Sequence, residues 1–117
     1  MNLLAVRLLN SKIKIIEVYG ISYTPFDEQY WEVSVLLPAF PKLTVIVQCT
    51  LSKSSDIISS DSFLCRIYSY GWKISPEKYS TEQRQEAYKL LDIFRKHICD
   101  MSISSAFECV CQCETRR

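Results

Sequence analysis

Two central segments of the chain alternate apolar and polar residues with a period of two. In residues 30–37 the apolar positions are Trp31, Val33, Val35 and Leu37, and in residues 42–51 they are Leu43, Val45, Val47, Cys49 and Leu51. Such alternation is typical of a β-strand that buries one face. Only residues 38–41, Pro-Ala-Phe-Pro, separate the segments. A connection this short predicts that the two strands pair antiparallel.

Four other segments have the β-rich composition or the alternation of strands: residues 3–9, 12–23, 63–72 and 106–113. The polar pair Asn10-Ser11 separates the first two, which predicts a hairpin. Residues 24–28, Thr-Pro-Phe-Asp-Glu, predict a turn, because proline presets one backbone angle and aspartate can bond its own main chain. Residues 52–62 contain six serines and predict a loop.

Over about residues 80–101 the apolar residues recur every three or four positions instead of every two. Ser80 and Gln83 have the spacing of a capping box, in which each side chain accepts a hydrogen bond from the other residue's backbone N–H. Lys89 and its charged neighbours fall on the opposite face from the apolar positions. This pattern predicts one amphipathic helix over about residues 80–101. Its apolar face consists of Ala87, Leu90, Leu91, Phe94, Ile98 and Met101.

The order of these elements is five strands, one long helix and one strand, which predicts an α+β fold. We expect an antiparallel β-sheet of about five to six strands with the helix of residues 80–101 packed on one face. The chain has 117 residues and no linker rich in proline, glycine and serine. It therefore predicts a single domain over residues 1–117.

Composition and charge exclude several classes of function. With 48% hydrophobic and 23% charged residues the chain resembles an ordinary globular protein, and its formal charge of +1 provides no general attraction to nucleic acid or to an anionic membrane. It has only two glycines, whereas phosphate-binding loops need two or three close together. No apolar run approaches the ~20 residues of a membrane helix. We therefore expect neither a nucleotide-binding loop nor a membrane partner.

Six cysteines are candidates for disulfides: Cys49, Cys65, Cys99, Cys109, Cys111 and Cys113. On a strand over residues 106–113 the last three would share one face with neighbouring Cα atoms about 6.6 Å apart, at the upper limit for a disulfide. We therefore expect reduced thiols and an intracellular, cytoplasmic protein. A cross-strand disulfide from one of these three to Cys49 or Cys65 is the alternative.

Metal binding or thiol chemistry would use His97 together with Cys99, Cys109, Cys111 and Cys113, because zinc accepts imidazole and thiolate ligands. Recurrent zinc sites use closely spaced cysteine pairs on turns, which direct two sulfur atoms at one point. Cysteines that alternate along a strand direct their sulfur atoms in parallel, so these do not converge on a metal ion. No cysteine-protease signature surrounds any of the cysteines. We expect no cofactor, no bound metal and no catalytic residue, with a zinc- or thiol-dependent protein centred on these residues as an alternative.

Arg66, Tyr68, Tyr70 and Trp72 form the candidate partner-binding surface. On a strand over residues 63–72 the three aromatic side chains point the same way, as a row that contacts a protein or stacks the bases of a single-stranded nucleic acid. Leu64 falls on the same face and favours a third possibility, burial of the row beneath the helix. The near-neutral charge favours a protein partner over nucleic acid.

The sequence therefore predicts a small, non-enzymatic protein-binding module. Compact chains of this size without motifs are often inhibitors, immunity proteins or accessory proteins of viruses and mobile elements, which is an association with size and not with any residue. The alternatives are the zinc- or thiol-dependent protein and a single-stranded nucleic-acid binder that uses the aromatic row.

Overall fold

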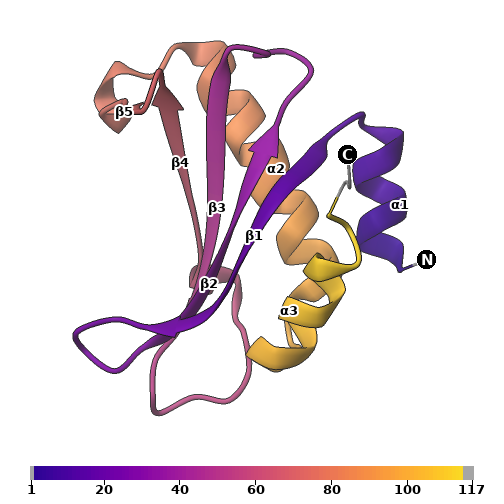
Figure 1. Ribbon diagram of the computed structural model, residues 1–117, viewed down its shortest axis with the longest axis vertical. Coiled ribbons are helices and arrows are strands. Elements are labelled where there is room, and N and C mark those ends of the chain that lie inside the picture. The colour runs from indigo at the N-terminus through magenta and orange to yellow at the C-terminus, as the bar shows by residue number, and fades with distance from the viewer. Residues whose placement is uncertain (1, 115–117) are drawn as a thin grey trace.

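The computed structural model describes residues 2–114, which form one five-stranded antiparallel sheet and three α-helices (Figure 1). The predicted α+β fold, with one long helix, is confirmed. Two 3-10 helices, η1 (Ser60–Ser62) and η2 (Pro76–Lys78), precede β4 and α2. The strands follow one another in the sheet in chain order: β1 (Lys14–Tyr23), β2 (Gln29–Leu36), β3 (Leu43–Leu51), β4 (Phe63–Ser69) and β5 (Trp72–Lys73). The helices are α1 (Leu3–Asn10), α2 (Thr81–Ile98) and α3 (Ile103–Cys111).

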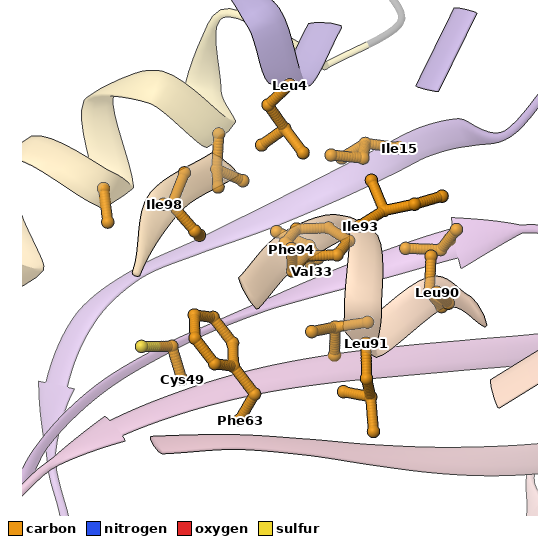
Figure 2. Packing of buried hydrophobic residues seen from close by; sticks show 14 of the residues in the cluster. Leu4, Ile15, Val33, Cys49, Phe63, Leu90, Leu91, Ile93, Phe94 and Ile98 are labelled. Atoms are coloured by element: carbon orange, nitrogen blue, oxygen red, sulfur yellow. The ribbon is translucent and has the colours of Figure 1, made fainter. Parts of the chain in front are cut away.

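One face of the sheet and the three helices share a single hydrophobic core. Helix α2 runs along the sheet, while α1 and α3 lie at the side of β1 (Figure 1). Figure 2 shows side chains from α1, α2 and β2 meeting in this core, among them Leu4, Phe94 and Val33. The other face of the sheet is covered by no helix of residues 2–114. We call it the open face.

The central strands pair as predicted. Val33 of β2 lies opposite Val47 of β3 in an antiparallel register, and the apolar positions that alternate along both strands lie on the helix side. The predicted turn at residues 24–28 joins β1 to β2. The N–H of Thr24 donates to the carbonyl of Glu28 at 2.9 Å, and Asp27 adopts a φ of 60°. Both predictions are confirmed.

Helix α2 begins as the capping box predicts. Ser80 Oγ accepts from the Gln83 N–H at 3.0 Å, and Gln83 Oε1 accepts from the Ser80 N–H at 2.9 Å. The helix ends at Ile98 and not at residue 101, because Cys99 adopts an extended backbone (ψ 149°) and Asp100 a left-handed one (φ 70°). Neither α2 nor any other helix of the described residues has the length and apolarity to cross a bilayer. The predicted phase is confirmed by the buried residues Leu90, Leu91, Phe94 and Ile98.

The predicted strand over residues 3–9, and its hairpin to residues 12–23, are wrong. The segment forms α1, whose N-terminus is capped by Asn2, with the side-chain oxygen accepting from the Ala5 N–H at 2.7 Å. Leu4 and Leu8, one helical turn apart, are buried. In so apolar a run the strand and helix patterns both fit, and contacts with α2 and α3 select the helix.

The predicted strand over residues 106–113 is also wrong. The chain forms α3, and its N-cap Ser102 accepts from the N–H of Ser105 at 3.1 Å. A helical pattern overlaps the alternation of the cysteines, because Ile103, Ala106 and Val110 are buried at spacings of three and four. Residues two apart on a helix point in nearly opposite directions. Cys109, Cys111 and Cys113 therefore do not share one face.

Residues 63–72 form a tight hairpin instead of a single strand. Tyr70 and Gly71 have φ values of 51° and 83°, the left-handed conformation that a two-residue hairpin turn requires at both positions. Ser69 then pairs with Trp72, and Tyr68 with Lys73. Directly paired residues point to the same face, so Trp72 lies on the face opposite Tyr68. The predicted single row of three aromatic residues is therefore wrong.

The serine-rich loop between β3 and β4 is anchored by Ile58, which is buried. The Ile58 N–H donates to the carbonyl of Met101, and the N–H of Asp100 donates to the carbonyl of Ile58, both at 2.9 Å. These bonds join the loop to the segment between α2 and α3. The loop therefore closes one end of the core.

Candidate functional site

The open face carries two of the predicted partner-binding residues, Arg66 and Tyr68. Both are half-buried among their neighbours on the sheet, while Leu64 is 52% exposed. The possibility that this face is buried beneath the helix, which the position of Leu64 had favoured, is therefore wrong. The register across β2, β3 and β4 arranges the face in two rows of three, Ser34, Ile46 and Arg66, and Glu32, Gln48 and Leu64, with the pair Thr44 and Tyr68 beside them.

Arg66 forms an ion pair that crosses the sheet. Its Nη2 donates to Glu32 Oε2 at 3.2 Å, so that the contact reaches over β3 from β4 to β2. The Nε of Arg66 is buried and has no hydrogen-bond partner among residues 2–114. The ion pair neutralises the positive charge of Arg66.

Tyr70 and Trp72, the other two predicted residues, lie at the turn between β4 and β5. Their side chains are 82% and 81% exposed. In Figure 1 β5 lies at the outer edge of the sheet, on the side away from α1 and α3. The predicted surface thus has a flat part on the sheet, with Arg66 and Tyr68, and a projecting part at the turn.

A hollow of about 370 Å³ lies on the open face, beside the ion pair. The hydroxyl of Tyr19 donates to the carboxylate of Glu17, and this hydrogen bond raises the pKa of Tyr19 above its ordinary value. Glu32, which also lines the hollow, is already bound to Arg66. The two carboxylates here are thus bound to neighbouring side chains, Glu17 to Tyr19 and Glu32 to Arg66.

A larger groove, of about 540 Å³, lies between β4 and α2. None of the patterns used to predict the binding surface indicates it. Its strand wall is formed by residues 63–65, and Tyr88 on the helix wall is 69% exposed. A signal was present in the sequence, because a stripe at helical spacing runs along α2 and overlaps the predicted apolar face at Ala87 and Leu91. That stripe consists of Arg84, Ala87, Tyr88, Leu91 and Arg95.

The residues considered for metal binding do not come together. Among residues 2–114 no group of three or more His, Cys, Asp or Glu side chains is arranged to hold a metal ion. All six cysteines are free thiols. Burial raises the pKa of Cys49 and of Cys65 to about 12 and that of Cys113 to about 11. These three thiols stay protonated at neutral pH, which makes them weak nucleophiles.

No protein-family model, curated protein or solved structure matches the chain.

Proposed function

We propose that the chain is a small, non-enzymatic protein-binding module that contacts its partner through Arg66, Tyr68, Tyr70 and Trp72. The observation that carries this proposal is the exposure of Tyr70, in the two-residue turn, and of Trp72, which follows the turn and pairs with Ser69 of β4. Tyrosine and tryptophan side chains bury a large area on binding, and they lose little conformational entropy because they have few rotatable bonds. They dominate the energetics of protein interfaces. A turn that presents two of them suits an interface.

The alternatives find less support in the geometry. Base stacking needs aromatic rings on one platform, whereas Tyr68 and Trp72 lie on opposite faces and Arg66 is paired with Glu32. A zinc site needs ligands that converge, and the described residues supply no such group. We place the protein in the cytoplasm, where its free thiols persist, as an inhibitor or accessory protein.

The test is affinity purification from the native host with matched variants. Phe26→Ala is the control, because Phe26 is an equally exposed aromatic residue at the opposite hairpin, between β1 and β2. We expect a stoichiometric protein partner to remain with wild type and with Phe26→Ala. With Tyr70→Ala or Trp72→Ala its affinity should fall by about 2 kcal/mol or more, which is roughly thirtyfold in Kd.

Two outcomes would contradict the proposal. A partner retained equally by all variants would place the interface elsewhere. Oligonucleotide binding that weakens with Trp72→Ala and falls steeply with salt would identify a nucleic-acid binder. Melting curves accompany each variant, because exposed side chains should be replaceable without loss of folding.

A further inference from the structure

The two outer edges of the sheet are covered to different extents. Along β1 the Val18 N–H donates to a carboxylate oxygen of Glu114 at 3.1 Å, and Ile15 forms a bridge with the same residue. The end of the described chain thus covers the outer edge of β1 at Ile15 and Val18. An uncovered strand edge, in contrast, is a template for pairing with another chain.

Along β4 the covered part of the edge ends at Ile67. Its carbonyl accepts from the Ile74 N–H at 2.9 Å, and its N–H donates to the hydroxyl of Tyr79 at 3.3 Å. Alternate residues of a strand direct their backbone groups to the same edge, so those of Cys65 point outward as well. No described residue bonds them there. The chain cannot continue as a strand, because Pro76 begins η2 and lacks an N–H.

This open edge borders the groove between β4 and α2. The groove volume of about 540 Å³ falls in the range of about 300–1,000 Å³ that is typical of ligand sites. Ala87, Tyr88 and Leu91 line the helix wall with apolar surface. The groove therefore offers main-chain partners on one wall and an apolar wall for side chains on the other.

The charges around the groove favour an acidic occupant. Arg84 and Arg95 border it, against a single acidic residue, Glu77. Neither arginine forms an ion pair with any of residues 2–114. Arg95 Nε donates to the carbonyl of Ser60 at 2.8 Å, which restrains the side chain at the groove. Both guanidinium groups have donors left for carboxylates.

We propose that the groove binds an extended, acidic peptide segment of a partner protein, which adds to the sheet as a strand beside Phe63–Cys65. The inference rests on the proposed function, since it specifies how part of a protein partner binds. The added strand would continue the line of β5 beyond Ile74, where the chain itself turns away. Backbone hydrogen bonds then supply affinity, while the apolar wall and the arginines select side chains.

The test uses the full chain and a display library of random linear peptides as the probe. We expect the selected peptides to be enriched in Asp and Glu. Amide hydrogen exchange reports the added strand directly: the Cys65 N–H should exchange at least about tenfold more slowly with a saturating selected peptide. The N–H of Leu64, which faces β3, is the internal reference and should change little.

Substitutions on the exposed surface separate the groove from the hairpin. Tyr88→Ala and Arg84→Glu should each weaken the selected peptide by about tenfold or more. The matched controls, Phe26→Ala at the β1–β2 turn and Lys96→Glu elsewhere on α2, should leave its Kd unchanged.

Three results would overturn the inference: no enrichment of acidic peptides, no protection of Cys65, or peptides that respond to Tyr70→Ala and not to Tyr88→Ala. Each of these leaves the proposed function standing. That function fails separately if the purified partner is indifferent to Trp72→Ala.

Discussion

The burial of two cysteine thiols makes the stability of the fold depend on pH. Burial raises the pKa of Cys49 and of Cys65 to about 12, whereas a cysteine in the unfolded chain ionises near pH 8.5. Below about pH 8.5 both states hold neutral thiols, and the stabilising difference is fully present. As the pH rises from there toward 12, only the unfolded chain releases these protons. The free energy of unfolding therefore decreases as the pH increases.

We expect the free energy of unfolding, measured by urea denaturation, to fall between about pH 8 and pH 10. Each thiol contributes up to about 1.4 kcal/mol per pH unit once it is ionised in the unfolded chain. Cys49→Ala is the matched variant. It lowers stability at neutral pH but should flatten this slope. Equal slopes in wild type and Cys49→Ala would show that Cys49 is not the titrating group.

At the scale of elements, Asn2 links the two helices that flank β1. Its side-chain oxygen caps α1, and its Nδ2 donates to the carbonyl of Cys109 in α3 at 3.0 Å. Asn2→Ala should lower the free energy of unfolding by about 1–2 kcal/mol in chemical denaturation, because it removes the cap. Asn2→Asp keeps the acceptor and removes the donor, so its smaller cost isolates the contact with α3. An Asn2→Ala variant as stable as wild type would contradict this role.

The phase of α2 is tested by two adjacent residues. Leu90 is fully buried in the core, whereas Lys89 is exposed and forms only a surface ion pair with Glu86. We expect Leu90→Ala to cost about 2–5 kcal/mol of stability, through lost burial and a cavity. Lys89→Ala should stay within about 0.5 kcal/mol of wild type in the same denaturation experiment. Similar costs at the two positions would show that the helix is rotated about its axis.

At the scale of the whole molecule, burial orders the thiols by reactivity. Cys111 is exposed and Cys49 is buried, with the other four between them. A thiol reagent applied to the folded protein should modify Cys111 first and Cys49 only on unfolding. In denaturant without reductant six thiols should react, and elemental analysis should find no stoichiometric zinc. A count below six would indicate a disulfide, and one equivalent of zinc would restore the metal-binding alternative.

Local pattern alone determined the centre of this fold. Around Val33 and Val47 the apolar residues alternate with polar ones, so only one face of each segment can be buried. This pattern is sufficient to predict strands β2 and β3 and the face that each of them buries. The capping box of Ser80 and Gln83, followed by a long helical period, leaves no competing structure for α2. Exposed aromatic residues at Tyr70 and Trp72 were also anticipated, although not their arrangement.

Tertiary structure decided the ends of the chain and the groove. Residues 3–9 are apolar at almost every position, and the cysteine alternation in residues 106–113 overlaps a helical pattern, so neither local pattern selects one state. Helices this short are marginal on their own, and they form here because Leu4 and Val110 are buried in the shared core. The open edge at Cys65 likewise exists only because Pro76 turns the chain away from β4 beside α2. Such a feature depends on where separate elements lie in space, which no local pattern encodes.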